Sequence, residues 1–282
     1  SYILCGNGAA DLIFSYVLAE KPKKALVTAP TFSEYEQALR TVGCDIHHVY
    51  LYTKDDFEVN ENILLNLTSD LDVVFLCSPN NPTGKKIPKN LLTQILEKCV
   101  EYQIRLILDE CFYEFLENPE EATMQAEVKN CSQLVILRAF TKMHAIPGLR
   151  LGYILCRDNS LLERMQRVRQ PWSVSTVAQA AGVAAIEEGA RVEKTRQYIT
   201  KERKRMELEL ESIGISYIPS DANYILIYYE GKESLYEKLL EKNILIRDCQ
   251  NYIGLKKGYY RIAIKRKEEN DRLLTALREE VE

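Results

Sequence analysis

Residues 138–153 read Arg138-Ala-Phe-Thr-Lys-Met-His-Ala-Ile-Pro-Gly-Leu-Arg-Leu-Gly-Tyr153 and connect two apolar segments through a polar turn. The first segment, Leu134-Val-Ile-Leu137, and the second, residues 151–156, each predict a strand. Lys142 lies in the turn, and Arg150 directly precedes the second strand. Because open α/β sheets bind ligands outside their strand ends, the two cations are candidates for a ligand site. The alternative is two solvated cations in an ordinary loop.

Short apolar segments alternate with helix-like segments over the first 160 residues. Strands are predicted for residues 25–29, 46–51, 71–77 and 104–109, and helices for residues 12–18, 34–42 and 88–102. Segment 71–77 is apolar on both faces, as a buried parallel strand is. The alternation therefore predicts an α/β fold with a mostly parallel central sheet flanked by helices.

The remainder of the chain has a different pattern. Residues 159–205 are mostly helical, with a break at Gln170-Pro-Trp-Ser173. A smaller α+β unit follows, with predicted strands at 215–218, 224–228, 244–247 and 259–264 and helices at 234–242 and 267–282. We therefore predict a large domain over 1–160, linking helices over 161–205 and a small C-terminal domain over 206–282.

Composition narrows the class of protein. The net charge of -4 and the dispersed lysines and arginines lack the basic stripe of nucleic-acid-binding proteins. No apolar run reaches the roughly 20 residues of a membrane span, and no secretory leader pattern is present, so we expect a soluble cytoplasmic protein. The eight cysteines are scattered without a C-x-x-C pair, and there are only three histidines. We therefore expect reduced core cysteines and no metal site.

Polar residues follow several of the predicted strands. Gly6-Asn-Gly8-Ala-Ala10 leads into a helix whose free backbone N–H groups suit a phosphate, although many Gly-x-Gly turns are only turns. Asn81 lies in the proline-rich loop Ser78-Pro-Asn-Asn-Pro-Thr-Gly84, where it forms either an Asx-turn or part of a site. Asp109 ends the next strand as either a helix cap or a ligand. Arg247 and Arg261 lie in the tail strands, either solvated or holding an anion by bidentate contacts.

These residue types together are the set that pyridoxal 5'-phosphate (PLP) chemistry requires. A lysine amine forms a Schiff base, and an aspartate keeps the pyridine nitrogen protonated so that the ring accepts electrons. Arginine and backbone N–H groups bind the phosphate, and an asparagine donates to the ring oxygen. A flat apolar side chain covers the ring, for which Phe32 is the candidate.

Several motifs make the chain recognisable. Ser78–Gly84, Asp109-Glu-Cys-Phe112 and Thr141–Tyr153 resemble the fold type I PLP enzymes of the aspartate aminotransferase superfamily. Within that superfamily, the chain resembles the threonine-phosphate decarboxylases of cobalamin synthesis and the related histidinol-phosphate aminotransferases from end to end. The motifs that carry this closer resemblance are Gly6-Asn-Gly8, Phe140–Gly148, Pro171-Trp-Ser-Val174, Ala222-Asn-Tyr224, Ile244–Tyr252 and Gly258–Ala263.

The resemblance implies a role for each candidate residue. Lys142 would be the Schiff-base lysine, Asp109 the partner of the pyridine nitrogen, and Asn81 the donor to the ring oxygen and a substrate contact. The phosphate would be bound by Arg150, the backbone of Gly8, Ala9 and Ala10, and the Thr141 hydroxyl. Arg261 matches the carboxylate-binding arginine of the family, and Arg247 with it would hold a doubly anionic substrate.

Three departures from the family pattern stand out. Phe112 replaces the tyrosine common in aminotransferases, which fits a decarboxylase, and Ala139 replaces a common Ser or Thr phosphate ligand. The chain also starts just before the phosphate turn, so it resembles a fragment whose full-length form would be a homodimer.

The expected function is decarboxylation of L-threonine O-3-phosphate, with histidinol-phosphate transamination as the alternative. A non-catalytic PLP-fold domain would be expected to lack part of the Lys142, Asp109 and Asn81 set. A Rossmann-type dehydrogenase would need a third glycine after Gly6-Asn-Gly8. The expected partner is a small phosphorylated amino acid, with no nucleic acid and no membrane.

Overall fold

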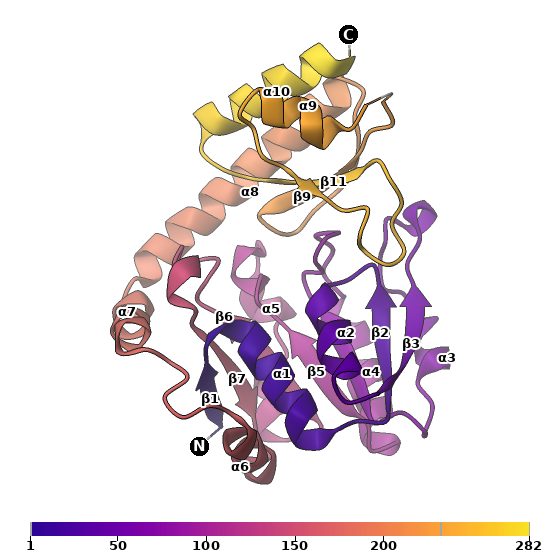
Figure 1. The fold of residues 1–282 in the computed structure, drawn as a ribbon, viewed down its shortest axis with the longest axis vertical. Helices are drawn as coiled ribbons and strands as arrows, with labels where there is room; N and C mark the ends of the chain where they lie inside the picture. The colour runs from indigo at the N-terminus through magenta and orange to yellow at the C-terminus, as the bar shows by residue number, and fades with distance from the viewer. Residues whose placement is uncertain (1, 232, 282) are drawn as a thin grey trace.

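The computed structural model describes residues 2–231 and 233–281. Figure 1 shows a larger part built around a seven-stranded sheet and a smaller part built around a four-stranded sheet. The long helix α8 (Gly189–Ser212) runs from the side of the larger part to the smaller one.

The seven strands of the large sheet lie in the order β1-β7-β6-β5-β4-β2-β3. Their bounds are β1 Ile3–Gly6, β2 Lys24–Ala29, β3 Asp45–Tyr50, β4 Val73–Cys77, β5 Arg105–Asp109, β6 Leu134–Ala139 and β7 Gly152–Cys156. The five strands from β3 to β6 are parallel, whereas β7 is antiparallel to both β6 and β1. The prediction of a mostly parallel sheet is confirmed.

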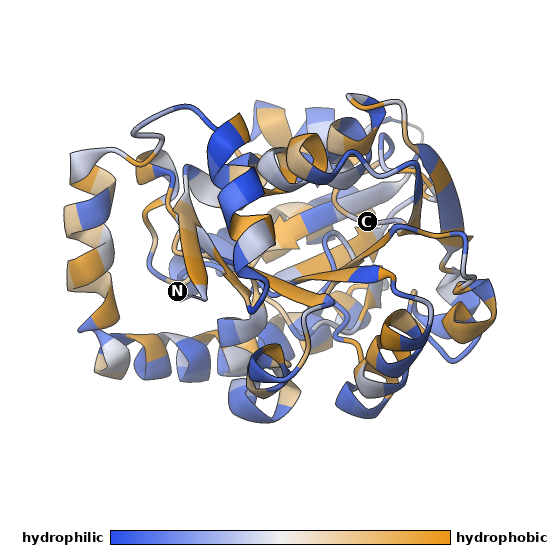
Figure 2. Ribbon diagram, turned by 90° about the horizontal axis from the view of Figure 1, so that it is seen from below, coloured by the Kyte–Doolittle hydropathy of each residue, from blue (hydrophilic) through white to orange (hydrophobic). Residues whose placement is uncertain are grey.

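Helices cover both faces of this sheet because its strands are apolar on both sides. Along β4, Val73 and Phe75 belong to one core with α1 (Gly8–Glu20), α2 (Ser33–Arg40) and α6 (Asn159–Val168). Val74 and Leu76 belong to the opposite core with α3 (Ile63–Asn66) and α4 (Lys89–Glu101). This alternation is the two-residue period of a strand buried between two layers. In Figure 2 the central strands are mainly hydrophobic, while the surrounding helices alternate in hydropathy.

Short helical segments complete the larger part. They are η1 Thr53–Asp55, η2 Tyr113–Phe115, α5 Pro119–Ala122, η3 Gln125–Lys129 and η4 Pro147–Leu149, followed at its side by α7 Thr176–Ile186.

The smaller sheet is fully antiparallel, in the order β10-β11-β9-β8. Its elements are β8 Ser216–Ile218, β9 Tyr224–Tyr228, α9 Leu235–Glu241, β10 Arg247–Asp248, β11 Tyr259–Ala263 and α10 Lys267–Val281. The last residue of the predicted helix 267–282, Glu282, lies outside the described residues. The domain division at residues 160 and 205 stays a prediction.

One predicted strand was placed wrongly. Residues 244–246 are not in a strand, and β10 comprises only Arg247 and Asp248. The reason is the end of α9, where Asn243 takes a left-handed conformation with φ of 56°. The Ile244 N–H then donates to the Leu239 carbonyl at 2.8 Å. The chain therefore completes a helix cap here instead of extending a strand.

Within the described residues, no helix combines the length and apolar character that a bilayer crossing requires.

Candidate active site

A cavity of about 410 Å³ lies between the strand ends of the large sheet and the smaller sheet. Its lining includes Ala9, Ala10, Phe32, Asn81, Asp109, Thr141, Lys142, Arg150, Arg247 and Arg261. Gly8 is buried beneath it, against the Arg150 guanidinium. The structure thus brings the residues predicted from sequence to one place.

Parallel strand ends explain part of this convergence. Cys77 at the end of β4 pairs with Asp109 at the end of β5, and Asp109 pairs with Leu137 in β6. Lys142 follows β6 in a turn where the Ala145 N–H donates to the Lys142 carbonyl at 3.0 Å. Side chains leaving these strands therefore meet at one edge of the sheet.

Asp109 is buried and held by two donors. The Tyr35 hydroxyl donates to Asp109 Oδ2 at 2.6 Å, and the Cys111 N–H donates to Oδ1 at 2.9 Å. Burial raises the pKa of Tyr35 well above its ordinary value, and the Asp109 charge raises it further, so Tyr35 stays a donor. The carboxylate is therefore fixed in one orientation. Tyr35 was missed by the sequence reasoning, although a tyrosine on the buried face of α2 needs a partner for its hydroxyl.

The Lys142 amine faces the cavity. Its Nζ lies 5.5 Å from the centre of the Phe112 ring, and it makes no ion pair or hydrogen bond with the residues that the structure describes. Phe112 in turn contacts Tyr224 edge-on, with ring centres 5.0 Å apart. The neighbouring Met143 is buried in the core of the smaller part and anchors the turn. An amine placed in this way is available to a ligand.

The Asn81 amide is oriented by Arg261 in β11 and by Tyr252 in the connection before it. Arg261 Nη1 donates to Asn81 Oδ1, and the Tyr252 hydroxyl approaches the same atom at 3.4 Å. Because the oxygen is occupied by donors, Asn81 Nδ2 remains to donate elsewhere. Tyr224 also holds this loop, since its hydroxyl donates to the Asn80 carbonyl at 2.9 Å. The sequence motifs contained Tyr224 and Tyr252 but gave neither of them a role.

The N-terminus of α1 forms a close-packed turn. Gly8 has φ of 82°, and a Cβ there would lie 2.7 Å from Arg150 Nη2. A Cβ at Gly152 would likewise lie 2.7 Å from the Ala9 nitrogen. Asn7, at the N-cap, makes no side-chain hydrogen bond to the helix. A guanidinium packed against uncapped helix N–H groups suits a phosphate dianion, so this turn fits the phosphate of PLP.

Thr141, a predicted phosphate ligand, and Ala139, which replaces a common Ser or Thr phosphate ligand, lie beside this turn. Thr141 is buried and lines the cavity, which allows its hydroxyl to contribute. Ala139 also lines the cavity, and it brings no hydroxyl.

Arg247 and Arg261 are direct partners across β10 and β11. The Arg247 guanidinium lies 5.7 Å from the centre of the Tyr252 ring, and that of Arg261 lies 5.0 Å from the Tyr224 ring. Both arginines line the cavity, so they offer two adjacent guanidinium groups to an anionic ligand.

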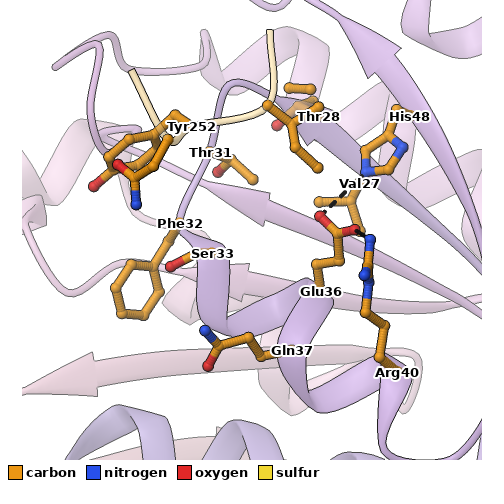
Figure 3. Close-up of a pocket in the computed structure, with 13 residues that line it drawn as sticks. Val27, Thr28, Thr31, Phe32, Ser33, Glu36, Gln37, Arg40, His48 and Tyr252 are labelled. Carbon is orange, nitrogen blue, oxygen red and sulfur yellow. Dashed lines mark hydrogen bonds and ion pairs between the residues drawn. The ribbon is translucent and has the colours of Figure 1, made fainter. Parts of the chain in front are cut away.

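Phe32 lies between this cavity and a second one of about 230 Å³. Its ring meets Tyr35 edge-on at 5.6 Å. Figure 3 shows the second cavity, with Phe32 and Tyr252 on one side and Glu36 between His48 and Arg40 on the other. Phe32 is thus positioned as an apolar wall of the main cavity.

Comparison with known proteins agrees with this geometry. Residues 1–277 match the family model for aminotransferase class I and II. The chain belongs to this family. A threonine-phosphate decarboxylase from Salmonella typhimurium is 40% identical over 99% of this chain and 76% of its own length.

Two solved structures have the same fold as this family member. The histidinol-phosphate aminotransferase from Clostridium acetobutylicum has a TM-score of 0.91 and 32% identity, covering 99% of this chain and 83% of its own. The L-threonine-O-3-phosphate decarboxylase from Porphyromonas gingivalis has a TM-score of 0.84 and 26% identity, covering 98% and 82%.

Proposed function

We propose that this chain forms a PLP-dependent site that decarboxylates L-threonine O-3-phosphate. The products would be carbon dioxide and (R)-1-amino-2-propanol O-2-phosphate, in the step that the sequence resemblance assigns to cobalamin synthesis. The observation that carries the proposal is the pairing of Arg247 with Arg261 in the cavity that also contains Lys142 and Asp109. The relative at 40% identity supports the same reaction.

The residues of the cavity fit the cofactor. When bound, PLP supplies an aldehyde that links to an amine and a protonated ring that accepts the electron pair of a breaking bond. Lys142 Nζ would form the covalent link, and Arg150, Thr141 and the backbone of Gly8, Ala9 and Ala10 would hold the phosphate. Asn81 would donate to the ring oxygen, and Phe32 would cover the ring.

Asp109 would keep a proton on the ring nitrogen. Its carboxylate suits this task because Tyr35 and Cys111 already occupy one position on each oxygen and fix its plane. The substrate amine would displace Lys142 from the cofactor aldehyde, and the freed Lys142 Nζ, near Phe112, would then return a proton to the substrate carbon that loses its carboxylate. Phe112 provides an apolar wall that limits water at this position.

Two anchors would select the bond that breaks. Threonine phosphate carries a carboxylate and a phosphate, and Arg261 and Arg247 can each form a bidentate pair with one of them. Fixing both ends sets the rotation about the α-carbon and therefore which of its bonds is presented for cleavage. Arg247 and Arg261 are direct cross-strand partners in β10 and β11, which supports such an orientation.

The second candidate function is histidinol-phosphate transamination, which the solved structure with a TM-score of 0.91 favours. Histidinol phosphate lacks a carboxylate, so it would occupy only one of the two arginine sites. A non-catalytic binding domain is less well supported, because Lys142, Asp109 and Asn81 are all present in the cavity.

We also propose a cytoplasmic homodimer as the active form, which analytical ultracentrifugation and cell fractionation would test.

The deciding experiment supplies each substrate separately to the purified protein with PLP. We expect carbon dioxide release from threonine phosphate and no 2-oxoglutarate-dependent loss of histidinol phosphate. Transamination of histidinol phosphate without carbon dioxide release from threonine phosphate would overturn the decarboxylase proposal.

A further inference from the structure

Arg169 lies outside the cavity and connects three segments around the N-terminus of α1. It follows α6, and its side chain is only 8% exposed. Arg169 Nη1 donates to the Cys5 carbonyl in β1 at 2.8 Å, and Nη2 donates to Asp11 Oδ2 at 3.1 Å. Nη2 also donates to the Ser173 hydroxyl in the connection to α7. One guanidinium thus joins β1, the first turn of α1 and the segment after α6.

Asp11 extends this connection to the residue before the helix. The same Oδ2 atom accepts a hydrogen bond from the Asn7 N–H at 2.9 Å. The packing there is tight, because a Cβ at Gly6 would lie 2.9 Å from Asp11 Oδ2 and 2.6 Å from Leu12 Cγ. The backbone from Gly6 to Asp11 therefore has little freedom to rotate while the pair is intact.

This is the turn whose backbone faces the cavity. Ala9 and Ala10 line it, and Gly8 contacts Arg150, whereas neither Asp11 nor Arg169 is among the lining residues. We propose that the Asp11–Arg169 pair is a positioning device that aims the first N–H groups of α1 at the cofactor phosphate. This inference rests on the PLP site proposed above, and it concerns residues that the sequence motifs left without a role.

A second ion pair, between α6 itself and α1, provides a matched control. Arg164 in α6 donates to Glu20 at the C-terminal end of α1 at 2.6 Å, far along the helix from the turn. If Asp11–Arg169 only fastened α6 to α1, breaking either pair would have the same consequence. The positioning role predicts that only the Asp11–Arg169 pair affects phosphate binding.

For one variant, an argument from charge alone predicts the opposite change in phosphate binding. Asp11 is a carboxylate in the first turn of the proposed phosphate-binding helix. Removing its charge in Asp11→Ala reduces repulsion and would strengthen phosphate binding if charge alone mattered. If Asp11 positions the turn, the same change weakens phosphate binding, because Arg169 and the Asn7 N–H lose their shared acceptor.

The experiment compares two ligands on the full chain after removal of bound cofactor. Pyridoxine and pyridoxine 5'-phosphate lack the aldehyde, so neither links to Lys142, and they differ only in the phosphate. Isothermal titration calorimetry gives the ratio of their dissociation constants, which reports the phosphate contacts alone. For the unmodified protein we expect a preference for the phosphate on the order of a hundredfold.

We expect Arg169→Met and Asp11→Ala each to reduce this preference roughly tenfold, the loss typical of one charge-assisted hydrogen bond. Arg164→Met should leave the preference unchanged. Circular dichroism melting checks folding, and Asp11→Ala keeps the test available if Arg169→Met does not fold. An unchanged or increased preference in Asp11→Ala would overturn the inference.

The outcome also separates this inference from the proposed reaction. A protein that prefers the phosphate ligand and shows the variant effects, but does not decarboxylate threonine phosphate, retains the positioning role and loses the reaction. An unmodified protein without any preference for the phosphate would overturn both the cofactor site and the inference.

Discussion

Tyr35→Phe tests whether the Asp109 carboxylate depends on a buried hydroxyl. Tyr35 is fully buried, and its hydroxyl is one of two donors to Asp109. The 2.6 Å distance is typical of a charge-assisted hydrogen bond, whose loss costs about 2 kcal/mol. For a chain of 282 residues this corresponds to a fall in Tm of about 5 °C. We also expect weaker PLP binding, because the carboxylate that is proposed to face the ring nitrogen keeps only the Cys111 N–H as a donor and is less firmly oriented.

Tyr16→Phe is the matched control for this prediction. Tyr16 is buried in the same core and packs edge-on against Phe75, the residue on which Tyr35 stacks. No carboxylate among the described residues accepts a hydrogen bond from the Tyr16 hydroxyl, so its removal should change Tm little. The assay is thermal unfolding with and without PLP, combined with PLP titration. Equal effects of the two variants on Tm and PLP affinity would refute the role assigned to Tyr35.

Four further predictions concern the site and the fold. Borohydride reduction of the protein with PLP should label Lys142, and a label on another residue would contradict its role. Asp109→Ala should keep this label while turnover falls on the order of a hundredfold, and normal turnover would contradict the role of Asp109. Arg261→Lys should lower turnover roughly tenfold despite the retained charge, because an ammonium cannot form a guanidinium fork, and unchanged kinetics would argue against bidentate binding. Burial opposes ionisation of Asp158, but hydrogen bonds from Ser160, the Leu161 N–H and Arg105 lower its pKa to about 2. Its ionised form therefore stabilises the fold above pH ~4 by about 2 kcal/mol. Asp158→Asn should lower the free energy of unfolding, measured in urea, above that pH, and its difference from the unmodified protein should vanish as the pH falls toward ~2.

The sequence predicted the elements of the large sheet well because its signals are local. Apolar runs such as 71–77 and 104–109 end at turn residues, and each run contains the observed strand. The error at residues 244–246 arose from the same kind of signal. Three consecutive apolar residues, Ile244-Leu-Ile246, predict a strand, but the preceding helix uses this segment for its cap.

The sequence predicted which residues gather at the site but not how they are held. Tyr35 is 74 residues from Asp109, and Tyr252 is 171 residues from Asn81. Such partners depend on the packing of separate elements, which one sequence does not reveal. The motifs predict an anion-binding role for Arg261, whereas its contact with Asn81, 180 residues away, is seen only in the structure.

The proposed phosphate site depends on the direction of one strand. Because β7 is antiparallel to β6, the chain returns after the Lys142 turn, and Arg150 precedes β7 at the edge where β6 ends. A parallel strand would require a crossover connection and would begin at the opposite edge. Since β1 is also antiparallel to β7, Gly6 pairs with Gly152, which in turn pairs with Ala139 at the end of β6. The reversal of β7 therefore brings the N-terminus of α1, Arg150 and Lys142 together, although α1 lies more than a hundred residues earlier in the chain.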